Sequence, residues 1–98
     1  MLVVRDIFQL RFGKAKEALP LAKEGAGLER EAGYAVGRIL SDVTGEYYTL
    51  VMESQFASLA DFDQARANLA SSPAWGDWYA RFSPLVVSGR REIFRVVD

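Results

Sequence analysis

Cysteine and histidine are both absent from this chain of 98 residues. Without them the protein forms no disulfide, holds no catalytic thiolate or imidazole, and lacks the side chains that most often bind zinc or haem. We therefore expect no metal site and no cofactor. The remaining residue types do not define a reaction, so the sequence leaves the catalytic residues of any activity unknown.

An excess of charge of one sign is also missing, because 12 Lys and Arg residues oppose 13 Asp and Glu residues and leave a formal net charge of -1. A phosphate backbone requires a basic face, so we expect no nucleic-acid partner. Long apolar runs are missing too, and the first apolar segment is interrupted by Arg5, Asp6 and Arg11. This pattern argues against a secretion signal and a membrane partner, and we expect a cytoplasmic protein.

Half of the residues are apolar and 12% are aromatic. This is enough for one compact core and too little for two, so residues 1–98 are predicted to form a single domain. No internal repeat, low-complexity tract or linker divides the chain.

Four segments alternate between apolar and other residues with the period of two that is typical of strands. They cover residues 2–12, 35–43, 47–56 and 90–97. A two-residue turn at Gly45-Glu46 would join the second and third segments as a hairpin. In the register set by that turn, Arg38 pairs with Glu53, Ile39 with Met52, Leu40 with Val51, Ser41 with Leu50, and Val43 with Tyr48.

Helical periodicity fills the two intervals between these strands. Residues 14–32 carry apolar side chains every three or four positions, and Pro20 predicts either a kink or a later start of this helix. A second helix is predicted from a serine N-cap at position 58 to about position 70. The pair Ser72-Pro73 then starts a third, short helix that ends near position 83.

The resulting order β-α-β-β-α-β predicts an α+β fold of the ferredoxin-like type, with a four-stranded antiparallel sheet and the helices on one face. Alternation places one set of apolar side chains under the helices: Leu2, Val4, Phe8, Leu10, Ile39, Val43, Tyr48, Leu50, Met52, Phe94 and Val96. The other face mixes apolar residues, Val97 among them, with charged ones. Burial would stabilise each apolar side chain by roughly 1.5–3 kcal/mol, which favours a second sheet on this face. We expect a homodimer with this interface: Val3, Arg5, Ile7, Arg38, Leu40, Val51, Glu53, Ile93 and Arg95.

Four short segments of this chain resemble the NIPSNAP family of the dimeric α/β-barrel superfamily. They are the strand Val4–Leu10 that leads into Gly13-Lys14, the junction Phe56–Phe62, the helix restart Ser71–Trp75, and the strand entry Gly89–Ile93. The Ser-Leu-Ala and Ser-Pro-Ala-Trp sequences within them are the more specific pieces. The resemblance covers nearly the whole chain and implies two protomers that pair sheet to sheet across a two-fold axis. It brings no agreed set of catalytic residues.

A candidate ligand site combines aromatic side chains with Asp6, the one carboxylate that alternation places on the helix-covered face. An apolar pocket with a few polar groups is typical of small-molecule sites. We expect such a site to be lined by Asp6, Tyr48, Met52, Trp75 and Trp78.

Each of these features also has a purely structural interpretation. The aromatic residues of the third helix have the spacing of core packing, which is the commoner role. Asp6 in an apolar environment needs a donor, for example a tyrosine hydroxyl, a tryptophan indole or a helix N-terminus, and otherwise becomes a candidate general base. Ion pairs are expected between Arg38 and Glu53, and between Asp42 and either Arg5 or Arg95. These pairs have two alternative interpretations, as a binding site for an acidic metabolite or as structural cross-strand pairs.

Two functions of different classes follow. In the first, the protein is a non-catalytic homodimeric module that binds a small apolar or aromatic ligand or serves as an interaction unit. In the second, it is a cofactor-independent monooxygenase or isomerase like others of the superfamily, acting on a small aromatic or polyketide-like substrate. Asp6 or a tyrosine would then be the proton acceptor.

Overall fold

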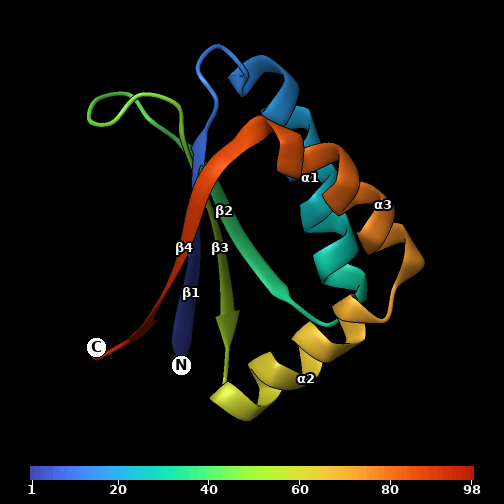
Figure 1. Ribbon diagram of the computed structural model, residues 1–98. Helices are drawn as coiled ribbons and strands as arrows, with labels where there is room; N and C mark the ends of the chain where they lie inside the picture. The colour runs from blue at the N-terminus through green and yellow to red at the C-terminus, as the bar shows by residue number, and fades with distance from the viewer.

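A four-stranded antiparallel sheet with all of its helices on one face forms the molecule (Figure 1). The computed structural model describes residues 1–98. Its elements are β1 (Leu2–Leu10), α1 (Ala15–Glu31), β2 (Ala35–Ser41), β3 (Thr49–Phe56), α2 (Leu59–Ala70), α3 (Pro73–Phe82), the 3-10 turn η1 (Ser83–Leu85) and β4 (Val86–Arg95). The strand order β2-β3-β1-β4 confirms the predicted ferredoxin-like fold. None of the helices combines the length and the apolar character needed to cross a bilayer.

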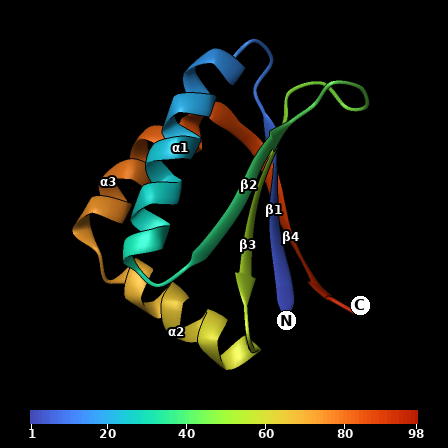
Figure 2. The same cartoon turned by 180° about the vertical axis from the view of Figure 1, so that it is seen from behind.

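The long helix α1 lies across the sheet, with α3 beside it and α2 at the lower end of both (Figures 1 and 2). It starts at Ala15 and continues through Pro20 to Glu31, so the alternative that it begins close to the proline is wrong. Its buried face consists mainly of very small residues, Ala18, Ala22, Gly25 and Ala26. Small side chains allow α1 to approach its neighbours closely.

Gly25 marks the closest of these approaches. A Cβ atom at this position would lie 2.5 Å from Cζ2 of Trp78, a side chain that is only 2% exposed. No ordinary Cβ contact is that short, and the tryptophan ring has no room to move. Glycine at this position therefore permits the packing of α1 against α3.

Serine caps start the two shorter helices as predicted. The Oγ of Ser58 accepts a hydrogen bond from the backbone N–H of Asp61 at 3.1 Å, and the Oγ of Ser72 accepts one from Trp75 at 3.4 Å. Each cap satisfies an amide that the first helical turn leaves without a partner. The caps fix where α2 and α3 begin, and thereby the position of the aromatic residues on α3.

The core has two parts, both between the sheet and the helices. The first lies under α1 and α3 and contains Leu10, Ala18, Ala22, Ala26, Leu50, Met52, Trp78 and Phe82. The second lies against α2 and contains Val4, Tyr34, Phe56, Phe62, Ala65 and Leu69. Val36, Leu28 and Trp75 pack against both parts.

The β2–β3 hairpin confirms part of the predicted register. Three predicted pairs are present: Ile39 with Met52, Leu40 with Val51, and Ser41 with Leu50. Beyond Ile39 the register shifts, because Gly37 and Arg38 form a bulge opposite Glu53 and Val36 pairs with Ser54. The bulge keeps both Val36 and Ile39 on the helix-covered face.

The predicted Gly45-Glu46 turn is wrong. The strands of the hairpin are joined by a wider loop over residues 42–48. At the base of this loop, the backbone N–H of Thr49 donates a hydrogen bond to Oδ1 of Asp42 at 2.9 Å. Inside the loop, the hydroxyl of Thr49 donates to the carbonyl of Glu46 at 2.9 Å. These side-chain hydrogen bonds stabilise the longer loop, so Val43 and Tyr48 do not pair and Val43 is 96% exposed.

The predicted faces of the last strand are reversed, and the strand begins at Val86 rather than near Arg90. Its register pairs Val4 with Ile93 and Val3 with Phe94. Opposed residues share a face, so Phe94 points away from the helices, whereas Ile93 and Arg95 lie on the helix side of the sheet. Val96 and Val97 lie beyond the strand. Both faces of this segment carry arginines and apolar residues, so alternation alone does not determine which one faces the core.

Candidate functional site

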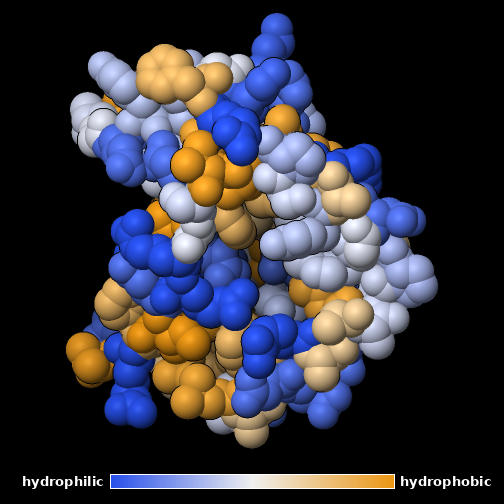
Figure 3. Space-filling view, in the orientation of Figure 1, coloured by the Kyte–Doolittle hydropathy of each residue, from blue (hydrophilic) through white to orange (hydrophobic).

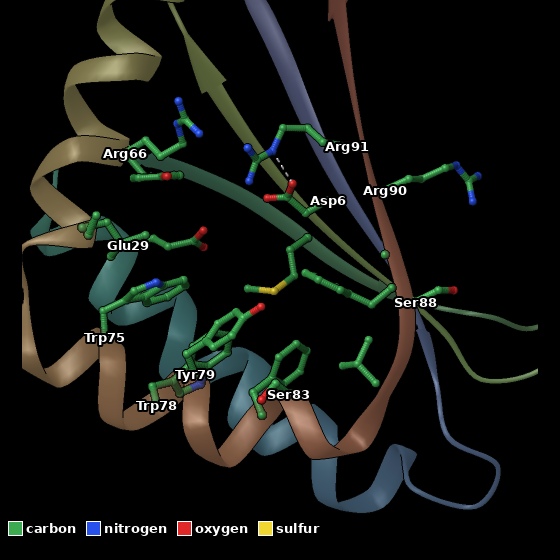
Figure 4. A pocket seen from close by; sticks show the side chains of 18 residues that line it. Asp6, Glu29, Arg66, Trp75, Trp78, Tyr79, Ser83, Ser88, Arg90 and Arg91 are labelled. Carbon is green, nitrogen blue, oxygen red and sulfur yellow. Dashed lines mark hydrogen bonds and ion pairs between the residues drawn. The ribbon is translucent and has the colours of Figure 1, made fainter.

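A cleft of about 630 Å³ opens between the sheet and the helices on the side of β1 and β4. In Figure 3 it is the hollow at the middle of the molecular face, with hydrophilic side chains along its sheet side. Helix α1 closes the back of the cleft, α2 and α3 form one wall, and β1 and β4 form the other (Figure 4). Because β4 is an edge strand that the helices leave uncovered, the space above it stays open.

Aromatic rings form the floor and one wall of the cleft. The rings of Trp75 and Trp78 stack with centroids 4.4 Å apart, and Trp78 stacks on Phe82 at 4.7 Å. Phe8 from β1 meets Phe82 edge to face at 5.2 Å. The indole N–H of Trp78 donates to the carbonyl of Leu21 at 2.6 Å, which fixes this ring in the core. The wall is therefore flat, rigid and apolar.

The opposite end of the cleft is polar and contains Asp6. The Nε–H of Arg91 donates to Oδ1 of Asp6 at 2.7 Å across the β1–β4 pair (Figure 4). Asp6 thus has a structural partner, although it is none of the donors expected from the sequence. The reason is the register of β4, which brings Arg91 directly opposite Asp6 on the helix side of the sheet.

Glu29 from α1 points into the same end of the cleft, toward Asp6 (Figure 4). The residue is 7% exposed, and its carboxylate forms neither a hydrogen bond nor an ion pair within the chain. Burial, reinforced by the negative charge of Asp6, raises the pKa of Glu29 from 4.5 to about 7, although Arg91 and Arg30 act in the opposite direction. At neutral pH this side chain is therefore divided between its protonated and ionised forms.

Tyr34 lies beside Glu29 and lines the cleft as well. Burial, together with the charge of Glu29, raises the pKa of its phenol to about 12. Tyr34 therefore stays neutral across the physiological range, and Glu29 is the titrating group of this end of the cleft.

Two guanidinium groups complete the polar end. The Cζ atoms of Arg91 and Arg66 lie 5.1 Å and 5.8 Å from the ring centroid of Phe62, so both cations rest on the same aromatic side chain. Arg66 comes from α2 and Arg91 from β4. The cleft thus combines an aromatic slab with two cations, one paired carboxylate and one unpaired carboxylate.

Four of the five residues predicted for the ligand site line the cleft: Asp6, Met52, Trp75 and Trp78. The fifth, Tyr48, does not. Its backbone is left-handed, with φ of 60°, and its ring packs against Phe12 with centroids 4.6 Å apart. The wide loop turns this side chain toward the opposite end of the sheet.

Sequence reasoning missed Glu29, and Asp6 is not the only carboxylate on the helix-covered side. The signal was present in the spacing of α1, because Ala18, Ala22, Gly25 and Glu29 follow one another at intervals of three or four residues. A glutamate on that stripe lies on the buried face of the helix. Other glutamates on the same helix are exposed, so only its place on this stripe distinguishes Glu29 from them.

The outer face of the sheet holds the predicted interface residues except Ile93 and Arg95. Glu53 is buried there between Arg5 and Arg38, each of which donates through Nε at 2.8 Å. The hydrogen bond from Arg38 is the main reason that the pKa of Glu53 is lowered. The predicted ion pair of Arg38 with Glu53 is present, although the bulge removes the predicted backbone pairing of these two residues. Arg5 pairs with Glu53 rather than with Asp42.

The fold has counterparts among solved structures. A NIPSNAP family protein from Agrobacterium tumefaciens is 26% identical, with a TM-score of 0.92 over 99% of this chain and 93% of that one. A NIPSNAP domain protein from Burkholderia xenovorans is 18% identical, with a TM-score of 0.92 over 99% and 95% of the two chains. SnoaB, a cofactor-independent oxygenase from Streptomyces nogalater, is 13% identical, with a TM-score of 0.73 over 99% and 93%.

The more distant of these similarities concern the fold alone. No curated protein matches the sequence significantly. The NIPSNAP family profile, in contrast, matches residues 6–98, which is nearly the whole chain and includes the second half of β1, the other three strands and the residues of the cleft. The chain therefore belongs to the NIPSNAP family.

Proposed function

We propose that the protein binds a small, largely aromatic molecule in the cleft between its helices and the β1–β4 side of its sheet. The observation that carries this proposal is the combination of an open cleft of about 630 Å³, a stacked aromatic wall and a cluster of charged groups at one end. Sites for small molecules are concave, mostly apolar and supplied with a few orienting polar groups. Complete filling by core side chains, the alternative interpretation of the aromatic residues, would leave no such space.

We propose in addition that the binding unit is a homodimer, paired through the outer faces of two sheets. Apolar side chains on that face, Leu40 and Phe94 among them, are 36% and 49% exposed in the single chain. Between them lie Glu53 and its two arginine partners, so a second copy would meet a buried carboxylate that is already paired within its own chain. The cleft lies on the other side of the sheet, so each protomer would keep its own site open.

A neutral aromatic probe tests the binding function. We expect 2-naphthamide to bind saturably, with one molecule per chain, as measured by calorimetry and native mass spectrometry. The substitution Ala70→Phe places a ring at the rim of the cleft and is expected to weaken binding at least tenfold. Ala67→Phe is the matched control, because Ala67 is exposed on the same helix and does not line the cleft.

The two variants separate binding in the cleft from nonspecific adsorption. Equal affinity in wild type, Ala70→Phe and Ala67→Phe would mean that naphthamide binds elsewhere. Absence of saturable binding at millimolar concentration would remove the support for a ligand site and leave an interaction module as the remaining function.

A catalytic function is the second candidate, and Glu29 is the observation that favours it. Its carboxylate has no hydrogen-bonding partner within the chain and is available to a substrate proton, whereas Arg91 already engages the carboxylate of Asp6. The candidate reaction is a cofactor-independent oxygenation or an isomerisation of a small aromatic substrate. Oxygen uptake with 1,5-dihydroxynaphthalene that is lost in Glu29→Gln would support this candidate, and uptake no faster than without protein would contradict it.

A further inference from the structure

At the charged end of the cleft, only one of the two arginines has a carboxylate partner within the cleft. Arg91 pairs with Asp6, but Arg66, whose guanidinium rests on the same Phe62 ring, makes only an exposed contact of 3.4 Å to Asp63 on its own helix. Two guanidinium groups that converge on one ring repel each other unless an anion lies between them. The local charge therefore favours a negatively charged ligand group.

Glu29 is placed to respond to such a group. It faces Asp6 from β1 and Arg91 from β4, and Tyr34 lies beside it. The other charged groups nearby are Arg66 on α2 and Arg30 on its own helix. The packed surface of α3 contributes the aromatic rings of Trp75 and Trp78 and no charge. In the ionised form Glu29 repels an anion in the cleft. In the protonated form its hydroxyl donates a hydrogen bond to the same anion.

We propose that the cleft takes a small aromatic carboxylic acid, with Arg66 and Arg91 as the cationic partners of its carboxylate and protonated Glu29 as a hydrogen-bond donor to it. The ring of the ligand would lie against Trp75, Trp78 and Met52, and its carboxylate would point toward Glu29. This inference rests on the proposed binding function and specifies its ligand class. Because Glu29 is mostly ionised at pH 8, binding at that pH then includes the uptake of about one proton from water by its carboxylate.

The proton linkage makes affinity depend on pH in a defined direction. A carboxylate ligand stays ionised between pH 6 and pH 8, and the chain contains no histidine, so Glu29 is the group of the cleft that titrates in this range. If only the protonated form binds the ligand, the apparent affinity falls about tenfold from pH 6 to pH 8. The neutral amide of the same ring system has no charge to repel, so its affinity stays constant.

Calorimetry with 2-naphthoate and 2-naphthamide tests the proposal on the wild-type protein. We expect naphthoate to bind about tenfold more weakly at pH 8 than at pH 6, while naphthamide binds equally at both. Titrations at pH 8 in phosphate and in Tris, which differ in ionisation enthalpy, should show the uptake of about one proton per naphthoate bound. This measurement needs no variant, so it does not depend on the folding of a mutant.

Variants then test whether Glu29 is the group that takes up the proton. Glu29→Gln keeps a donor without a charge and is expected to bind naphthoate equally at pH 6 and pH 8, whereas the exposed control Glu31→Gln keeps the wild-type pH dependence. Arg66→Gln is expected to weaken naphthoate about tenfold at pH 6 and leave naphthamide unchanged. Naphthoate affinity that does not depend on pH, or binding without proton uptake, would overturn the proposal. In that case saturable naphthamide binding would still support the cleft as a ligand site, and failure of both probes would reject both proposals.

Discussion

Glu29 is the residue on which the chemistry of the cleft depends. It is buried, it has no partner, and its pKa lies near 7 instead of 4.5. Between pH 4.5 and pH 7, Glu29 of the folded protein holds a proton that the same residue of the unfolded chain has lost. The free energy of unfolding therefore decreases as the pH rises through this window, by up to about 3 kcal/mol for this one group.

We predict that Glu29→Gln removes this dependence. The variant should be more stable than wild type at pH 8 by up to about 3 kcal/mol and equal to it near pH 4, where wild-type Glu29 is protonated in both states. Urea denaturation at the two pH values measures the difference, with Glu31→Gln as the control for loss of one exposed charge. A wild-type protein that is more stable than Glu29→Gln at pH 8 would show that the ionised carboxylate has a partner in the fold.

The two carboxylates of the cleft differ in how far sequence predicts them. Alternation along β1 places Asp6 on the covered face, and that placement is correct. The pairing of Asp6 with Arg91 depends on the register of β4, which the mixed composition of both faces of that strand leaves open. The predicted position of Tyr48 in the ligand site is wrong for a related reason, because hydrogen bonds of Asp42 and Thr49 stabilise a wider loop than a two-residue glycine turn.

At the scale of elements, the approach of α1 to α3 positions the aromatic wall. Gly25 makes it possible, since a methyl group there would lie 2.5 Å from the ring of Trp78. Gly27, two residues later in the same helix, has no atom within 4 Å of an added Cβ. Substitution by alanine is therefore expected to have opposite effects on stability at these two glycines.

We expect Gly25→Ala to lower the free energy of unfolding by roughly 1–3 kcal/mol through overpacking. Gly27→Ala should raise it by about 0.5–1 kcal/mol, because alanine is the better helix former. Thermal and urea denaturation of both variants provides the measurement. A Gly25→Ala variant as stable as Gly27→Ala would mean that α1 and α3 pack less closely than described.

The elements themselves were largely predictable. Hydrophobic periodicity and the serine caps gave all four strands and all three helices, with errors of a few residues at their ends. The bulge at Gly37 and Arg38 and the early start of β4 could not be predicted, because both are set by contacts with a neighbouring strand. Local patterns determine an element, and pairing determines its register.

At the scale of the whole molecule, the sheet separates two surfaces of different composition. The helix side holds the cleft, and the outer side carries exposed apolar residues around the ion pairs of Glu53. In an isologous interface each substitution acts twice. A charge at the centre of the outer face should therefore prevent pairing and leave the cleft intact.

We predict that the wild-type protein sediments as a dimer at micromolar concentration and that Val51→Lys sediments at the monomer mass of 10.9 kDa. Leu40→Asp should act in the same way, and Leu59→Asp, an exposed position on α2, serves as the control. Circular dichroism distinguishes a folded monomer from an unfolded chain. Wild-type protein that sediments at the monomer mass would contradict the proposed pairing of the sheets.

Nuclear Overhauser contacts from bound 2-naphthoate test most directly the proposal that the cleft beside β4 is the ligand site. We predict contacts from the naphthalene protons to the methyl group of Met52 and to the indole of Trp75, recorded at pH 6, where binding is expected to be tightest. Contacts to Leu40 or Val51 on the outer face, or saturable binding with no contact to either cleft residue, would contradict it.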